Sequence, residues 1–161
     1  MHLTHTLPIF INEDSEILIL GSFPSVKFRE VMFYYGHPQN RFFRVLGSLF
    51  NESAPESVAD RKDFLKRHKI GLYDVIEECD IEGSADSSIR NVVPIDIVTI
   101  LNRYPKIKVI GVNGSKAKDL FNKHLFDKVG NAKVIYLPST SPANARMSLE
   151  DLVREYKEIL Q

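Results

Sequence analysis

Three short stretches of this 161-residue chain collect the side chains best suited to chemistry. "GSFPS" (residues 21–25) and "PSTSPAN" (residues 138–144) combine hydroxyls with proline turns. Hydroxyls and backbone N–H groups in such turns can bind phosphate oxygens without a metal ion. The third stretch, "YYGHPQNRFF" (residues 34–43), sets aromatic rings beside a polar loop. Each stretch alone is also typical of an ordinary turn or of buried rings. Whether the three stretches form a functional site therefore depends on where the fold places them.

Several familiar catalytic patterns are missing from the sequence. The first loop has neither the G-x-G-x-x-G nor the G-x-x-x-x-G-K-[ST] spacing, which argues against a dinucleotide or P-loop site. The five histidines and the single Cys79 show no H-x-x-x-H or C-x-x-C pair, and there is no G-x-S-x-G elbow. We therefore expect no metal, no cofactor and no covalent nucleophile.

The elements that must position these stretches alternate between strands and helices. Continuous apolar runs predict strands buried on both faces at residues 16–20, 70–76, 107–112 and 133–137. Helices are predicted to follow Asn40, Ser57, Pro94, Ser115 and Ser148. Residues 77–91 have no clear period and are predicted to be a loop. This order predicts one α/β domain over residues 1–161, a three-layer α/β/α sandwich with a central, mainly parallel four-stranded sheet.

The loops that carry the polar stretches each follow a predicted strand directly. These are residues 21–39, 113–115 and 138–145. Parallel strands bring such loops together at the carboxyl edge of the sheet, where α/β folds bind ligands. Asp74 interrupts an apolar strand near the same edge, although an aspartate there is equally typical of a cap or an ion pair. The sequence thus predicts one ligand site at this edge.

Composition excludes some classes of protein and leaves others open. The formal charge is balanced at 21 basic against 21 acidic residues, so any polyanion would have to meet a local basic surface. A lone cysteine predicts a reducing compartment. The start "MHLTHTLPIFI" has no basic region followed by a long apolar run, and no segment has the roughly 18 apolar residues of a membrane span. We expect a cytoplasmic protein that does not enter membranes.

The order of these motifs resembles the uracil-DNA glycosylase superfamily over nearly the whole chain, from about Ile17 to the last helix. Its mismatch-specific uracil glycosylases carry a run similar to "GHPQNRFF" and a closing loop similar to "LPSTSPANARMSLEDL". The hypoxanthine-DNA (deoxyinosine) glycosylase branch is closer, since it shares the "GSFPS" and "GHPQNRF" motifs and a pair like Asp86-Ser87.

The resemblance implies an enzyme. It predicts a monofunctional DNA N-glycosylase that excises deaminated bases, hypoxanthine first and also uracil or xanthine, in base excision repair. Its partner would be DNA containing such bases, it would need no cofactor, and we expect a monomer. The alternatives are a uracil or mismatch-specific glycosylase, a non-catalytic nucleic-acid-binding α/β module, and a hydrolase of free nucleosides.

The resemblance also implies roles for individual residues. Tyr35 would stack on a base flipped out of the duplex, with Phe23 as a second wall. Asp74 would accept the N–H that deamination creates on the base edge, and Asn113 would donate to the neighbouring carbonyl unless it is only a turn asparagine. Asn40 would direct water to the sugar, because Phe23 fills the slot where many members place an Asp or Asn for this task.

The remaining roles implied by the resemblance concern the duplex. Arg146 would plug or hold the DNA. The residues expected to contact DNA are Ser22, Ser25, His37, Ser139, Ser141, Asn144 and Arg146. The cations expected to supply a local positive surface are Lys27, Arg29, Arg41, Arg44 and Lys116.

Overall fold

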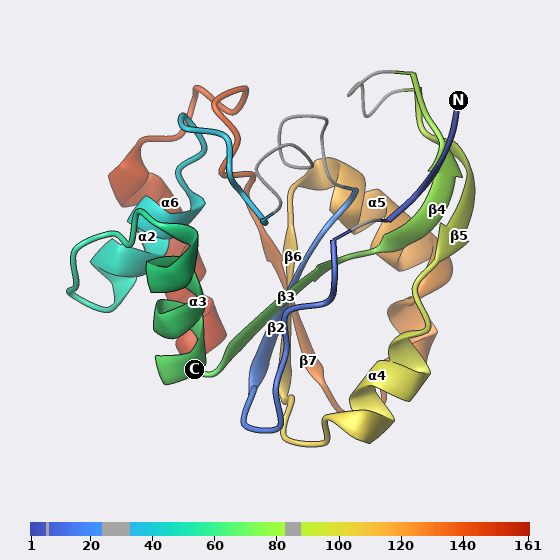
Figure 1. Ribbon diagram of the computed structural model, residues 1–161, viewed down its shortest axis with the longest axis horizontal. Coiled ribbons are helices and arrows are strands. Elements are labelled where there is room, and N and C mark those ends of the chain that lie inside the picture. Colours follow the sequence, from blue (N-terminus) through green and yellow to red (C-terminus); the bar gives the residue numbers. More distant parts are fainter. Residues whose placement is uncertain (6, 24–32, 83–87) are drawn as a thin grey trace.

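A central sheet of four parallel strands organises the molecule. The computed structural model describes residues 1–5, 7–23, 33–82 and 88–161 (Figure 1). The strands are β2 (Ile17–Gly21), β3 (Ile70–Asp74), β6 (Val109–Asn113) and β7 (Lys133–Leu137), in the order β3-β2-β6-β7 with every neighbouring pair parallel. The predicted parallel four-stranded sheet is confirmed.

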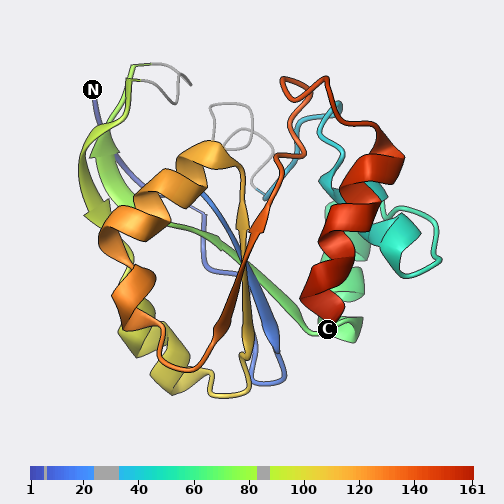
Figure 2. The same cartoon turned by 180° about the vertical axis from the view of Figure 1, so that it is seen from behind.

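Helices cover both faces of this sheet (Figures 1 and 2). Along β2, Ile17 and Ile19 pack on one face while Leu18 and Leu20 pack on the other. The first face lies against α2 (Phe42–Leu49), α3 (Val58–Arg67), α6 (Leu149–Tyr156) and the short η3 (Lys157–Leu160). The second lies against α4 (Ile97–Arg103) and α5 (Ser115–His124), and the short η2 (Phe126–Lys128) follows α5. The three-layer sandwich is therefore confirmed.

A second sheet takes up both ends of the loop predicted at residues 77–91, residues 77–80 and 90–91. It consists of β1 (His2–Thr4), β4 (Ile76–Asp80) and β5 (Arg90–Pro94), all antiparallel, in the order β1-β4-β5. The loop prediction is wrong at these two ends, where the β4–β5 pairing is interrupted by register shifts on either side of Glu78. Such irregularities break the two-residue period by which a strand is recognised.

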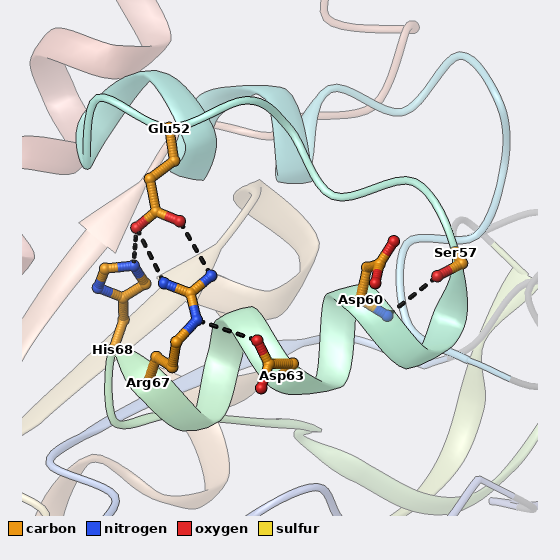
Figure 3. Close-up of polar contacts among 6 residues, drawn as sticks. All are labelled: Glu52, Ser57, Asp60, Asp63, Arg67 and His68. Carbon is orange, nitrogen blue, oxygen red and sulfur yellow. Dashed lines mark hydrogen bonds and ion pairs between the residues drawn. The ribbon is translucent and has the colours of Figure 1, made fainter.

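Two of the predicted helix starts are confirmed by their caps. Ser57 precedes α3 and accepts from the backbone N–H of Asp60 at 3.0 Å (Figure 3). Ser148 precedes α6 and accepts from the N–H of Asp151 at 3.1 Å, while the Asp151 side chain accepts from the Ser148 N–H. This reciprocal pair is a complete capping box.

Two other helix starts were predicted incorrectly. The α5 helix begins at Ser115 itself, and its N-cap is Gly114 with φ +98°, a conformation that glycine adopts without steric cost. Pro94 lies in β5, and α4 starts at Ile97 after Asp96, whose side chain accepts from the N–H of Thr99. Both corrections shift a helix start by one to three residues and leave the layers unchanged.

A charged cluster joins the end of α2 to α3 (Figure 3). The Glu52 carboxylate accepts from both terminal nitrogens of Arg67, at 2.9 and 3.2 Å, and from His68 Nε2 at 2.5 Å. Arg67 also donates to Asp63 at 3.0 Å. The hydrogen bonds from Arg67 hold the pKa of Glu52 below its ordinary value.

Within the described residues, no helix is long and apolar enough to span a membrane.

Candidate functional site

Register places three strand ends side by side at the carboxyl edge of the parallel sheet. Gly21 at the end of β2 is level with Asp74 at the end of β3. Leu20 is level with Val112, so Asn113, one residue further on, comes level with Gly21 from the other side. A cavity of about 460 Å³ opens above this row. That volume falls in the range of small-molecule sites, which is roughly 300 to 1,000 Å³.

Most of the residues predicted to form the site line this cavity. All three loops contribute to it, in agreement with the expectation that parallel strands bring these loops together at one edge of the sheet. The predicted residues on the wall are Ser22, Phe23, Tyr35, His37, Asn40, Asp74, Asn113, Ser139 and Ser141. Thr140 and Lys116 also line it, of which Thr140 was not singled out from the sequence. Among the described residues, no group of three or more His, Cys, Asp or Glu side chains could hold a metal ion.

Asp74 is a buried carboxylate at the base of the cavity, and only 6% of the residue is exposed. Its Oδ2 lies 2.7 Å from His5 Nε2. Its Oδ1 lies so close to Gly21 that a Cβ built there would meet it at 2.6 Å. The carboxylate therefore has one oxygen engaged by the histidine and the other directed along the row of strand ends.

Tyr35 forms one aromatic wall of the cavity. Its ring stacks on Phe42 with centroids 3.9 Å apart and an interplanar angle of 17°. Tyr35 is buried and also lines the cavity. Burial raises the pKa of Tyr35, Asp74 raises it further, and a hydrogen bond with Asn113 opposes them. Tyr35 has φ +55°, a strained conformation for a non-glycine residue that is often found at functional sites.

Asn40 sits where the first loop enters α2, and its amide oxygen has two donors. Oδ1 accepts from the backbone N–H of Phe42 at 2.9 Å and from the Thr140 hydroxyl at 2.8 Å. The predicted N-cap role is therefore shifted by one residue, because α2 starts at Phe42 and Arg41 is its formal cap. Asn113 joins the network through Nδ2, 3.5 Å from the Thr140 hydroxyl oxygen. The water-directing role of Asn40 and the base-reading role of Asn113 stay predictions.

The closing loop is fastened to the rest of the site by Arg41. Its guanidinium donates to the carbonyl of Asn144 at 2.9 Å and to that of Met147 at 2.5 Å. Arg41 is half-buried and keeps its charge, so its expected contribution to a local positive surface stays a prediction. Asn144 in turn donates to the carbonyl of Ser139 at 3.0 Å. Arg41 thus sets the position of the loop that carries the cavity serines.

The other residues predicted to contact DNA are placed in different ways. His37 lines the cavity and its Nδ1 accepts from the N–H of Gln39 at 3.1 Å. Asn144 and Arg146 are not part of the cavity wall, and Arg146 is exposed. Ser25 lies outside the described residues, as do Lys27, Arg29 and the pair Asp86-Ser87. Their proposed contacts with DNA stay predictions.

His5 is the main site residue that sequence reasoning missed. Its side chain is fully buried and bonded to Asp74, 69 positions away. No spacing rule connects two residues that far apart, and the pair forms only because an N-terminal strand joins a sheet that was not predicted. The one available signal is the polar pattern "HLTH" at residues 2–5, which is more typical of a solvent-exposed segment than of a binding site.

Comparison with known proteins identifies the family. The family model described as the uracil DNA glycosylase superfamily matches residues 8–161. This chain belongs to the uracil-DNA glycosylase superfamily. It is 37% identical over 142 residues, 88% of either chain, to a hypoxanthine DNA glycosylase of Methanosarcina acetivorans. It is also 37% identical over 141 residues, 86% of this chain and 87% of the relative, to a hypoxanthine DNA glycosylase of Methanosarcina barkeri.

A solved structure agrees with this assignment. The solution NMR structure of a candidate uracil DNA glycosylase from Methanosarcina acetivorans superposes with a TM-score of 0.80 at 32% identity, covering all of both chains. The family and the overall fold are therefore shared. The resemblance read from "GSFPS" and "GHPQNRFF" is confirmed.

Proposed function

We propose that this member of the superfamily is a monofunctional DNA glycosylase that excises deaminated bases, with hypoxanthine as its preferred target. The observation that carries the proposal is the Asp74 carboxylate at the base of a cavity of about 460 Å³, beside an aromatic wall. The names of the two Methanosarcina relatives support the choice of base.

Hydrogen-bond polarity explains why a carboxylate would favour deaminated bases. Adenine N1 and cytosine N3 are acceptors, and deamination turns each of them into an N–H donor. An ionised Asp74 only accepts, so it would bind the N–H of hypoxanthine or uracil and repel the lone pair of the unmodified base. A site whose buried polar group finds no partner on the wrong base can discriminate strongly.

The cavity has the other parts that base excision needs. The target nucleotide must leave the base stack, and we propose that its base stacks on the Tyr35 ring at the cavity wall, a contact worth roughly 1 to 3 kcal/mol. Ser22, Ser139 and Ser141 lie on the rim, where we propose that their hydroxyls bind the flanking phosphates. Lys116 lines the same cavity and would add positive charge.

In the reaction we propose, water attacks C1′ of the deoxyribose while the bond from C1′ to the base nitrogen breaks. The oxygen of water becomes the new hydroxyl at C1′, one proton of that water goes to the leaving base, and an abasic site remains. Asn40 would hold the water through Oδ1, with the water taking the position that the Thr140 hydroxyl occupies on that oxygen. Positioning a reactant in this way is a recognised source of rate enhancement.

Single-turnover excision tests Asn40. Asn40→Ala removes the amide oxygen, and we expect the rate on an inosine duplex to fall at least about a hundredfold, as when a reactant is misplaced by about 1 Å. Asn40→Asp keeps an oxygen for the Phe42 N–H and for water, so it should retain more of the rate. Ser57→Ala is the matched control, because it deletes a helix cap outside the cavity. Activity of Asn40→Ala within a few-fold of wild type would rule out this role.

A direct assay of the whole proposal uses four duplexes containing inosine, uracil, xanthine or only normal bases. We expect abasic product fastest from inosine, with strand breaks only after alkali. Faster release of uracil would favour a uracil or mismatch-specific enzyme. Salt-sensitive binding without abasic product would favour a non-catalytic module, and cleavage of free inosine would favour a nucleoside hydrolase.

We also propose that the protein acts as a monomer in the cytoplasm. The buried Cys79 forms no disulfide, and the chain therefore needs no oxidising compartment.

A further inference from the structure

The N-terminal segment brings a histidine against Asp74, a residue of the cavity wall. β1 pairs antiparallel with β4, and the next residue, His5, donates its backbone N–H to the carbonyl of Glu77. A few residues later, Phe10 pairs with Leu72 in the middle of β3. Figure 1 shows this segment running along β4 and then turning towards β3. The path brings the His5 ring against the last residue of β3, Asp74.

His5 lies entirely within protein. The exposed fraction of its side chain is 0%, and its Nε2 lies 2.7 Å from Asp74 Oδ2. Aromatic rings surround the imidazole, with centroids at 4.5 Å for Tyr73, 5.7 Å for Phe23 and 6.2 Å for Tyr34. Its Nδ1 is buried and has no hydrogen-bond partner among the described residues. His5 itself is not on the cavity wall, so it acts on a bound base indirectly, and Asp74 is the wall residue to which it is hydrogen-bonded.

The contacts of the two ring nitrogens select one protonation state. A neutral imidazole with its proton on Nε2 donates to Asp74 and leaves only a lone pair on the unpartnered Nδ1. An imidazolium would bury an unpaired Nδ1–H, and so would a neutral ring that accepted a proton from a protonated Asp74. Buried N–H groups without an acceptor are rare because they are costly. The hydrogen-bond contacts therefore fit a neutral His5 ring that carries its proton on Nε2 and donates it to an ionised Asp74.

We propose that His5 is a positioning residue that keeps Asp74 ionised and in one orientation, so that Oδ1 accepts only from bases with an N–H on that edge. This inference rests on the proposed function. It names the ligand class as lactam bases, which carry a ring N–H beside a carbonyl. His5 precedes residue 8, where the match to the superfamily model begins, so the histidine of the pair lies outside the matched region and Asp74 lies within it.

Variants of His5 separate this role from simple packing. His5→Gln keeps an N–H donor on a side chain of similar reach, whereas His5→Ala leaves Asp74 unpaired. An unpaired buried carboxylate favours its protonated form, which can donate to adenine N1. We expect His5→Ala to lose at least tenfold in single-turnover excision of inosine and to bind adenine duplexes relatively better. His5→Gln should recover to within a few-fold of wild type.

The matched control is His2→Ala, which alters an exposed histidine on β1, the strand that directly precedes His5. We expect it to leave both the rate and the base preference unchanged. Equal losses in His5→Ala and His5→Gln would show that only the ring's packing matters, and unchanged selectivity in His5→Ala would also overturn the proposal. Thermal unfolding of each variant identifies any that fail to fold. If a variant fails, the spectrum of the wild-type protein described next tests the role of His5 instead.

Long-range ¹H–¹⁵N spectra of the wild-type imidazoles test the pair without any activity. The His5 signals are assigned by their loss in His5→Gln. We expect a neutral ring protonated at Nε2, and a proton on Nδ1 would overturn the assignment. The two claims can fail separately: a wild-type protein that excises no base defeats the proposed function, whereas an active protein with the wrong ring state defeats only the role of His5.

Discussion

Replacing Gly21 with alanine tests whether the position of Asp74 determines excision. The new Cβ would lie 2.6 Å from Asp74 Oδ1 and 3.5 Å from the Tyr35 hydroxyl. Real Cβ atoms essentially never approach another atom closer than 3.0 Å, so the carboxylate has to move by several tenths of an ångström. His5 holds the other carboxylate oxygen, and the movement therefore strains that hydrogen bond as well.

The expected loss follows from the bond that the displaced carboxylate can no longer make. A hydrogen bond to a charged group contributes about 1.5 to 3 kcal/mol. Losing it in the transition state would slow excision by about ten- to a hundred-and-fiftyfold. The extra methyl group should also lower the free energy of unfolding by about 1 to 3 kcal/mol, as overpacking does. Urea unfolding and single-turnover excision of an inosine duplex measure the two effects separately.

Gly111→Ala provides a matched control in the same sheet. Its Cβ would meet the Leu137 side chain at 2.8 Å, and the terminal carbon of a leucine can move aside. We expect a comparable or smaller loss of stability, with excision within a few-fold of wild type. A folded Gly21→Ala protein that excises inosine at the wild-type rate would refute the idea that Asp74 must keep its position.

Two further predictions concern residues away from the base. Arg41→Lys replaces a planar fork, bonded to the carbonyls of Asn144 and Met147, with a single ammonium group that cannot hold both. We expect affinity for inosine duplexes to weaken by about tenfold, equivalent to ~1.4 kcal/mol, in fluorescence anisotropy, and unaltered affinity would show that the loop keeps its position without the fork. For Glu52, Arg67 lowers the pKa, so its ionised form stabilises the fold above the ordinary value of 4.5 and this contribution is lost as the pH falls below that value. Urea unfolding should show Glu52→Gln less stable than wild type at neutral pH, with the difference shrinking below pH 4.5, whereas a constant difference would contradict the linkage.

The sequence predicted the parallel sheet because its strands are buried on both faces. Leu18 and Leu20 pack against one helical layer and Ile17 and Ile19 against the other, so β2 reads as one apolar run. The hairpin of β4 and β5 could not be read in this way, since its register shifts place the buried Ile76 and Cys79 three residues apart. Local periodicity reports burial only where the pairing is regular.

The site was predictable to the extent that it follows from chain order. Loops after parallel strands had to meet, and this brought Tyr35, Asn40 and Asp74 to one cavity. What could not be predicted were contacts between segments distant in the chain, such as His5 with Asp74. The commitment of Arg41 to loop carbonyls was also hidden, because an arginine in the sequence looks the same whether it faces DNA or the protein itself.

The carboxylate of Asp74 is carried by a strand, whereas the tyrosine and serines around it are carried by loops. Groups mounted on strands are held more accurately than groups on connecting segments. An enzyme built in this way could acquire a new range of target lesions through substitutions at the strand ends while its grip on the duplex stays intact. Conversely, variation in the loops would tune how readily a nucleotide is everted without altering which one is accepted. Directed evolution of this scaffold can therefore treat choice of lesion and capture of nucleic acid as two separate libraries.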